Sequence, residues 1–259
     1  MQRWAAGVEY CGTRYSGWQR QADAPSVQQE VERALSAVAD HPIKLSAAGR
    51  TDAGVHAYNQ VVHFDSHAVR SAHAWVLGSN SQLPPDVSLR WVQPVAPVFH
   101  ARYGALARRY RYVILTGRSR SGLLAGRVAR CPLALDVHAM HRSAQALVGA
   151  HDFTSYRDAD CQAKSPVRSV HSLIVQQRGE FVTLDIRANA FLHHMVRNIA
   201  GVLMAIGQGR RHEDWAREVL ELRDRKRGGV TAEACGLYFI GPEYPAEFAL
   251  PAQPEFWFP

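Results

Sequence analysis

The sequence has 259 residues, of which 47% are hydrophobic and 20% are charged, and these proportions exclude a disordered chain or a fibre. Thirty Lys and Arg side chains against 23 Asp and Glu give a net charge of +7, which favours an anionic partner, either nucleic acid or an acidic membrane. No run approaches the roughly 18 apolar residues of a membrane-spanning helix, and the first ten residues lack the apolar centre of a signal peptide. We therefore expect a cytoplasmic protein.

The basic surplus is concentrated in one part of the chain. Val87 to Leu135 contains no Asp or Glu but holds nine arginines. Ordinary protein surfaces mix both signs of charge, so we expect this stretch to face the anionic partner. The four cysteines form no CxxC pair, which argues against a structural zinc site or a disulfide scaffold.

The first half of the chain predicts the element order β-α-β-β-α-β. Ser26 with Gln29 forms a capping box, and apolar residues at helical spacing continue to about residue 40. A second, shorter helix is expected over 71–79, before the Pro84-Pro85 break. The expected strands are 3–9, 43–47, 60–65 and 87–93.

The second half predicts the same order with one extra helix. The strongest helical stripe of the chain runs from Leu192 to Ile206. Expected strands are 106–115, 168–176, 180–187 and 235–240, and the other expected helices are 136–149 and 213–222. The fold class is therefore α+β, with two tandem ferredoxin-like (RRM-like) units whose antiparallel sheets lie side by side and carry helices on one face. We place the N-terminal unit at 1–104 and the C-terminal unit at 105–259.

The loop between two predicted strands, AGRTDAGVHA at 48–57, is the best candidate for chemistry. Gly49 and Gly54 bracket it, and Asp52 is a carboxylate in a basic protein, where it would repel phosphate unless it has a task or an arginine partner. Such a carboxylate can act as a nucleophile or as a general base. A plain turn is the competing interpretation, because Asp and Gly favour turns.

Several segments in the same order resemble the tRNA pseudouridine synthase A family. They are this loop, GVEYCG at 7–12, YSGWQ at 15–19, FHAR at 99–102, ARRYRY at 107–112, HDFT at 151–154 and NAFLHHMVRN at 189–198. The resemblance spans essentially the whole chain. One departure is Cys11, where the family usually has Asp; this position precedes the catalytic loop and is expected to affect RNA contact or the turn.

The resemblance implies a pseudouridine synthase fold and an isomerase that converts uridine to pseudouridine at positions 38, 39 and 40 of the tRNA anticodon stem-loop, with Asp52 as the essential aspartate. The product is an isomer, so no cofactor is expected. Asp52 could add to the uracil ring at C6, attack the ribose C1′, or abstract the 2′ proton and leave a glycal. The sequence does not separate these routes. Family members work as homodimers, so a homodimer is expected.

The resemblance also assigns substrate-binding residues. It makes Tyr110 the tyrosine that stacks on the target base, Arg50 the arginine that enters the space left by the flipped nucleotide, and Arg197 the arginine that pairs with the catalytic aspartate. A target uridine has to leave the stack before its glycosidic bond can be reached. Weaker RNA contacts are expected from Arg102, Arg109 and Arg111. An ordinary cross-strand aromatic is the alternative for Tyr110, and a helix-surface ion pair is the alternative for Arg197.

Two other classes of function compete with this one. A non-catalytic RNA-binding protein with two RRM-like units would carry the RRM signature string, which the sequence lacks. A metal site at His193-His194 has no third ligand at a recognised spacing, so no metal is expected, and a metal-dependent nuclease would need a carboxylate cluster. Arg223 to Arg227 is expected to be a solvated loop before two glycines.

Overall fold

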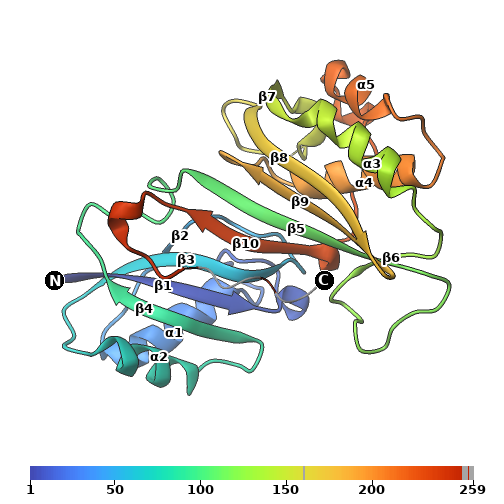
Figure 1. The fold of residues 1–259 in the computed structure, drawn as a ribbon. Coiled ribbons are helices and arrows are strands. Elements are labelled where there is room, and N and C mark those ends of the chain that lie inside the picture. Colours follow the sequence, from blue (N-terminus) through green and yellow to red (C-terminus); the bar gives the residue numbers. More distant parts are fainter. Residues whose placement is uncertain (160, 253–255, 257–259) are drawn as a thin grey trace. The chain divides into compact units, whose positions relative to one another are not determined.

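The computed structural model describes residues 1–159, 161–252 and 256, and these form two compact units. Unit 1 contains Met1–Leu106 together with Phe239–Phe256, and unit 2 contains Ala107–Tyr238 (Figure 1). The expected division into 1–104 and 105–259 therefore needs a correction at the C-terminal end. The reason is that the last strand, β10 (Leu237–Glu243), pairs with a strand of the first half of the chain, a long-range contact that element order does not reveal.

Unit 1 has the predicted element order β-α-β-β-α-β. Its sheet runs β4-β1-β3-β10, with β2 also paired to β3, and β1 is antiparallel to both of its neighbours. Helices α1 and α2 lie on one face of this sheet (Figure 1). The elements are β1 (Gln2–Tyr10), α1 (Val27–Ala39), β2 (Ser46–Ala47), β3 (His56–Ser66), α2 (Ala72–Asn80) and β4 (Val87–Pro94).

Helix α1 follows the sequence closely. The Ser26 hydroxyl accepts a hydrogen bond from the Gln29 amide, and Val27, Val31 and Leu35 are fully buried on the sheet side. The strand expected over 43–47 is shorter than predicted. The Ile43 amide donates to the Ser36 hydroxyl and the Leu45 amide to the Glu32 carboxylate, so two side chains of α1 hold backbone groups that a strand would have placed in the ladder.

Unit 2 contains a sheet in the order β5-β9-β8-β7, with β6 paired in parallel to β5. The β8–β9 hairpin and helices α4 and α5 lie close to their predicted ranges, whereas α3 ends at Ala144 and a 3₁₀ turn follows. Strands β6 and β7, of three and four residues, were not predicted. The elements are β5 (Ala107–Thr116), β6 (Ala129–Cys131), α3 (Val137–Ala144), β7 (Gly149–Asp152), β8 (Val167–Arg178), β9 (Phe181–Ala188), α4 (Met195–Gly207) and α5 (Trp215–Leu222).

Helix α4 is the central packing element of unit 2. Its stripe, including Ile199, Val202 and Leu203, is buried, as the helical spacing predicts. Helices α3, α4 and α5 lie on one face of the sheet of this unit (Figure 1). Among the residues that the structure describes, no helix has both the length and the apolar character needed to cross a membrane.

Candidate active site

The candidate catalytic loop connects β2 to β3, and buried groups fix its first residues. The Ala48 amide donates to the Val61 carbonyl over 2.8 Å. The Gln60 side chain binds both backbone groups of Gly49: its amide donates to the Gly49 carbonyl over 2.6 Å, and its oxygen accepts from the Gly49 amide at 3.4 Å. Gln60 is completely buried, so the chain enters the loop on a fixed support.

Thr51, the residue before the candidate aspartate, is held through its backbone and its side chain. The Trp18 amide donates to the Thr51 carbonyl over 3.0 Å. The Tyr10 and Thr51 hydroxyls are 2.7 Å apart, and both side chains are buried. Burial raises the pKa of Tyr10, so its hydroxyl keeps the proton that this hydrogen bond can use. We call Tyr10, Trp18 and Thr51 the loop clamp.

A tight turn follows Asp52. The Val55 amide donates to the Asp52 carbonyl over 3.1 Å, and the Gly54 amide donates to the Tyr15 carbonyl over 3.2 Å. Gly54 has φ 77°, a region that L side chains rarely adopt. Gly17 has φ 100°, and a Cβ there would come within 2.7 Å of the Thr51 carbonyl oxygen. The segment before α1 can therefore approach the loop because position 17 has no side chain.

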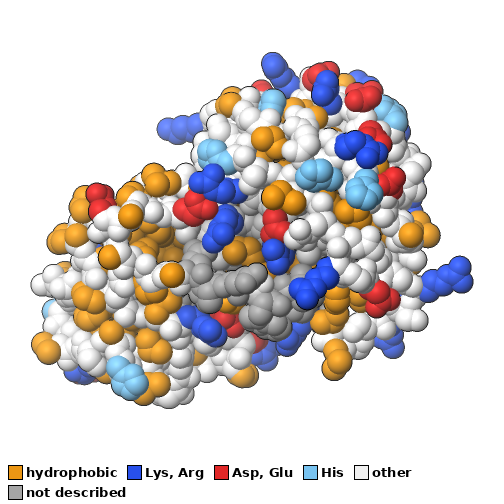
Figure 2. Space-filling model, viewed as in Figure 1, with side chains coloured by type: hydrophobic (Ala, Val, Ile, Leu, Met, Phe, Trp, Pro, Cys, Tyr) orange, Lys and Arg blue, Asp and Glu red, His pale blue; other side chains and the backbone are white. Residues whose placement is uncertain are grey.

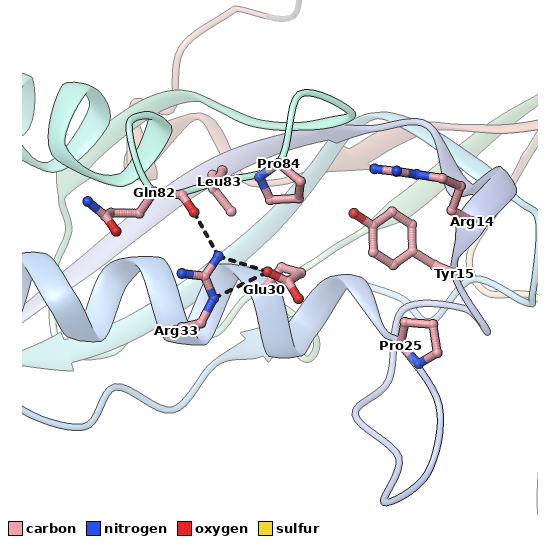
Figure 3. A pocket seen from close by; sticks show the side chains of 8 residues that line it. All are labelled: Arg14, Tyr15, Pro25, Glu30, Arg33, Gln82, Leu83 and Pro84. Atoms are coloured by element: carbon pink, nitrogen blue, oxygen red, sulfur yellow. Dashed lines mark hydrogen bonds and ion pairs between the residues drawn. The ribbon is translucent and has the colours of Figure 1, made fainter.

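A pocket lies beside Tyr15, whose carbonyl accepts the hydrogen bond from Gly54 of the loop. It has a volume of about 470 Å³, and Arg14, Tyr15, Glu30 and Arg33 are among the residues that line it (Figure 3). Its charged groups have partners within unit 1: Arg33 contacts the Glu30 carboxylate at 2.9 Å and donates to the Gln82 carbonyl at 2.7 Å. The Tyr15 hydroxyl and Arg14 both donate to Asp86.

These contacts fix the position of the backbone around Asp52. Thr51 and Val55 are buried on either side of it, whereas the Asp52 side chain is partly exposed and Arg50 is exposed. Because the backbone on both sides of Asp52 is fixed, less conformational entropy is lost when its carboxylate meets a substrate. The sequence motif identified Asp52 and its glycines, but it gave no signal for the hydroxyl pair of Tyr10 and Thr51.

Cys11 lies next to the start of β3. A hydrogen bond with His56 lowers the pKa of the Cys11 thiol to about 6, against the opposing effect of its burial. His56 is buried, and its Nδ1 accepts a hydrogen bond from the Gly12 amide at 3.0 Å. The position at which this chain departs from the family pattern thus holds an acidic thiol beside the end of the catalytic loop.

Three of the predicted site residues of unit 2, Arg109, Tyr110 and Arg111, lie on the basic strand β5. Tyr110 is 8% exposed, and the ring of Phe191 meets its ring edge-on, with centroids 4.9 Å apart. The Arg111 guanidinium donates to the Asp185 carboxylate over 2.7 Å on the neighbouring strand β9. Arg109 lies opposite Arg187 on the same pair of strands. In unit 1, Arg102 is exposed and its guanidinium lies 5.6 Å from the centre of the Tyr103 ring.

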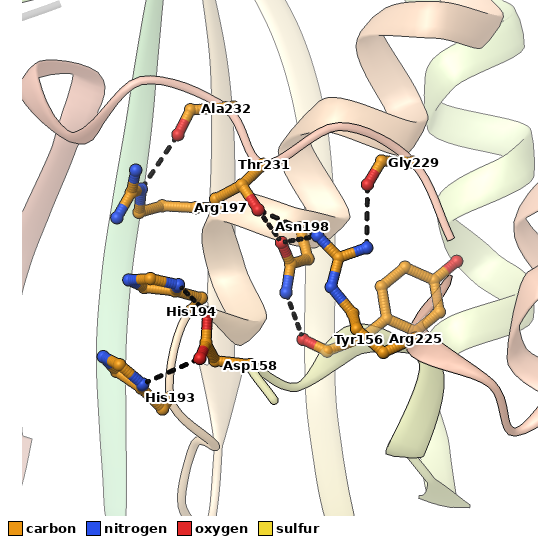
Figure 4. Close-up of polar contacts among 10 residues, drawn as sticks. All are labelled: Tyr156, Asp158, His193, His194, Arg197, Asn198, Arg225, Gly229, Thr231 and Ala232. Carbon is orange, nitrogen blue, oxygen red and sulfur yellow. Dashed lines mark hydrogen bonds and ion pairs between the residues drawn. The ribbon is translucent and has the colours of Figure 1, made fainter. Parts of the chain in front are cut away.

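Arg197 lies in the first turn of α4 and is tied to a following loop. Its Nε donates to the Ala232 carbonyl over 2.8 Å, and the Ala232 amide donates back to the Arg197 carbonyl over 3.1 Å. Asn198 accepts hydrogen bonds from Arg225 at 2.9 Å and Thr231 at 2.7 Å (Figure 4). Arg225 is therefore turned inward and partly buried, which corrects the expectation that the whole run at 223–227 is solvated.

The histidine pair ahead of α4 shares one carboxylate. The Nδ1 of His194 lies 2.6 Å from Asp158, and that of His193 lies 3.7 Å from it (Figure 4). The two imidazole rings stack at 4.0 Å, and His194 has φ 60°. The pair is thus oriented by Asp158. The predicted residues fall into two sets: Arg50, Asp52 and Arg102 in unit 1, and Tyr110, Arg109, Arg111 and Arg197 in unit 2.

The comparisons with known proteins agree with the motifs. The family model for tRNA pseudouridine synthase matches residues 6–104 and 143–245. A tRNA pseudouridine synthase A from Aeromonas salmonicida is 52% identical over 99% of this chain and 96% of its own length. One from Pseudomonas aeruginosa is 55% identical over 97% of this chain and 88% of its own length.

A solved structure, of a Cbf5-Nop10-Gar1 complex, aligns with 90% of this chain and 47% of the other chain. Its TM-score of 0.36 at 10% identity is too low to carry an argument. The family model covers well over half of the chain, and two relatives above 50% identity cover nearly all of it. The chain therefore belongs to the tRNA pseudouridine synthase family and is an isomerase that acts on tRNA.

Proposed function

We propose that this enzyme converts uridine to pseudouridine at positions 38, 39 and 40 of the tRNA anticodon stem-loop, with Asp52 as the catalytic aspartate. The observation that carries the proposal is the set of hydrogen bonds that holds the loop, in which the loop clamp takes part. Hydrogen bonds to Thr51, Gly54 and Gly49 fix the backbone on both sides of Asp52, whose carboxylate remains partly exposed. Such fixed placement is what a nucleophile or base needs in order to meet one atom of a bound nucleotide.

The reaction conserves all atoms. The bond between N1 of uracil and C1′ of ribose breaks, the base rotates, and a bond forms between C5 and C1′. The proton at C5 leaves and N1 gains one, so neither an oxidant nor a reductant is consumed. Asp52 can serve by adding to C6, by attacking C1′, or by removing the 2′ proton. All three routes use the same carboxylate, and all three require the target nucleotide to leave the stack.

Three further residues complete the proposed site. We assign Tyr110 to stack on the target base, since Phe191 supports its ring edge-on and leaves it slightly exposed. We assign Arg50 to the space that the flipped nucleotide vacates, since it is exposed and two residues from Asp52. We assign Arg197 to hold the catalytic carboxylate. The bond from its Nε to the Ala232 carbonyl orients the guanidinium, which is suited to a paired contact with a carboxylate.

Contacts outside the reacting centre are also expected to bind the tRNA. We assign Arg102, Arg109 and Arg111 to contacts with RNA phosphate. Of these, Arg111 also forms an ion pair with Asp185. The enzyme is proposed to act in the cytoplasm as a homodimer that binds the anticodon stem-loop. These assignments follow the family pattern and the basic charge of this region of the sequence.

The test is to map pseudouridine in tRNA after incubation with the purified protein and its variants. We expect wild type to modify positions 38 to 40, and Asp52→Asn to form no pseudouridine while binding tRNA with unchanged affinity. Asp23→Asn, which removes an exposed acid, is the matched control and keeps full turnover. Turnover by Asp52→Asn at the wild-type rate would refute the role of Asp52. Modification at other positions only would refute the proposed substrate site.

A further inference from the structure

The segment that follows β5 and ends in β6, residues 117–130, carries an unusual set of charges. We call it the arginine arm. Four arginines in it are exposed, and the segment lies within the stretch that has no Asp or Glu. Figure 1 shows the arm leaving the sheet of unit 2 at the C-terminal end of β5. The four are Arg118, Arg120, Arg127 and Arg130.

Several other surface arginines are paired with carboxylates. Arg3 pairs with Asp65 at 2.7 Å, and Arg142 pairs with Glu213 on another part of the chain. Within the described residues, none of the four arginines of the arm has a carboxylate partner. Glu180 lies beside Gly117 at the base of the arm, where its backbone carbonyl accepts a hydrogen bond from the Thr116 hydroxyl.

The arm is folded back onto the sheet, although its charges face solvent. Val128 is buried with Val113 and Leu115, and Leu124, Phe181 and Tyr238 pack against this cluster. The Tyr238 hydroxyl donates to the Arg127 carbonyl, and the Arg127 amide donates to the Leu124 carbonyl over 3.0 Å. The Arg130 guanidinium donates to the Arg118 carbonyl. A loop ordered in this way spends little conformational entropy when a partner binds its exposed guanidinium groups.

Exposed guanidinium groups that have no carboxylate partner and sit on an ordered support suit a polyanion, because the planar fork of Arg matches two oxygens of a phosphate. The enzyme acts on tRNA, whose backbone is such a polyanion. Tyr110 and Thr116 are six residues apart on β5, which corresponds to about 20 Å along a strand. The arm therefore begins well beyond the reach of a nucleotide that stacks on Tyr110. We propose that the arginine arm binds the tRNA backbone at phosphates remote from the reacting uridine.

This inference rests on the proposed function, and the experiment separates the two. The arm variant is Arg118→Ala, Arg120→Ala and Arg127→Ala together; Arg130 is kept because it supports the arm. The charge-matched control replaces the exposed Arg210, Arg211 and Arg217 by Ala. A third protein carries Lys at positions 118, 120 and 127. Thermal melting checks that each protein is folded. Affinity for full-length tRNA is then measured between about 50 and 200 mM salt, the range over which phosphate contacts change affinity strongly.

We expect the arm variant to bind tRNA more weakly, and its plot of log affinity against log salt to be shallower by about 2 to 3, since each phosphate contact contributes about 0.7 to 0.9. The control triple should change this slope by less than about 1, and the Lys variant should keep most of the wild-type slope. The single-turnover rate at saturating tRNA should be unchanged. Hydroxyl-radical footprinting should show protected backbone away from positions 38 to 40 that the arm variant loses.

An arm variant whose slope matches that of the control triple would overturn the proposal. So would loss of protection only at the reacting nucleotides. If wild type forms no pseudouridine, the proposed function fails by itself, whatever the arm does. If wild type is active and the arm variant is indistinguishable from it in tRNA binding, the arm fails while the proposed function stands.

Discussion

The loop clamp offers the sharpest test of how the structure positions Asp52. Tyr10 is 3% exposed and Thr51 is 7% exposed, and their hydroxyls are 2.7 Å apart. Tyr10→Phe removes one hydroxyl and leaves that of Thr51 buried without this partner. A buried polar group that loses its partner costs about 1 to 3 kcal/mol. We expect the free energy of unfolding to fall by this amount.

Because the loop clamp holds Thr51, the residue next to Asp52, the same substitution should also lower the rate of the reaction. A shift of about 1 Å at a catalytic group can cost about 100-fold in rate. We expect the single-turnover rate of pseudouridine formation to fall at least about tenfold in Tyr10→Phe, with tRNA affinity unchanged. Replacing Thr51 by Val together with Tyr10 by Phe removes both partners, and its loss of stability should be smaller than the sum of the two single losses.

The control for this test is Tyr156→Phe in unit 2. The Tyr156 hydroxyl is buried and donates to the Ala216 carbonyl over 2.8 Å, so its removal should cost stability to a similar extent. It should leave the rate unchanged, because this bond joins Tyr156 to α5 and none of the residues assigned to the site takes part in it. The reasoning is refuted if Tyr10→Phe loses stability but keeps the wild-type single-turnover rate. It is also refuted if Tyr156→Phe slows the reaction as much as Tyr10→Phe does.

The acidic thiol of Cys11 and the close packing at Gly201 can each be tested. Iodoacetamide should alkylate Cys11 with a midpoint near pH 6, read by mass spectrometry, because its lowered pKa makes the thiolate dominant above that pH, and His56→Ala should move the midpoint upward. An alkylation rate that does not change with pH would contradict the lowered pKa of Cys11. Since the folded pKa lies below the ordinary value of 9.0, the thiolate contributes stability that is complete above pH 9 and is lost as the pH falls through about 6. Gly201→Ala should destabilise the protein by about 1 to 3 kcal/mol in urea, because a Cβ there would lie 1.8 Å from the Val230 carbonyl oxygen. Gly122→Ala, where a Cβ meets nothing within 4 Å, should be close to neutral, and equal effects at both positions would count against the packing argument.

The local elements could be predicted because their signals are local. The Ser26 cap and the apolar spacing of α1 predicted that helix, and the stripe of α4 predicted the main helix of unit 2. Strand β6, of three residues, is too short to show a period of two, and its pairing with β5 is formed across a long loop. Ile43 and Leu45 have strand-like composition, yet two polar side chains of α1 hold their amides.

In the candidate site, too, the features with a local sequence signal could be predicted and those formed by long-range contacts could not. Asp52 and Gly54 could be found from the motif, because a short loop with glycines is visible in one stretch of sequence. The hydrogen bonds that hold Thr51 come from Tyr10 and Trp18, which lie more than 30 residues earlier in the chain, and no local pattern connects them to it. Arg225 looked like one of a run of solvated charges. Its inward position depends on Asn198, which only the folded chain brings near.

The return of Phe239–Phe256 to unit 1 has a consequence for how the protein is made. Within the described residues, unit 2 is the continuous segment Ala107–Tyr238, and it is synthesised before unit 1 receives its last strand. Until β10 arrives, part of the edge of β3 has no pairing partner, and an open strand edge is a site where chains associate wrongly. The first unit to be synthesised is therefore the last to be completed, and the edge of β3 is open to wrong pairing in the interval between these events.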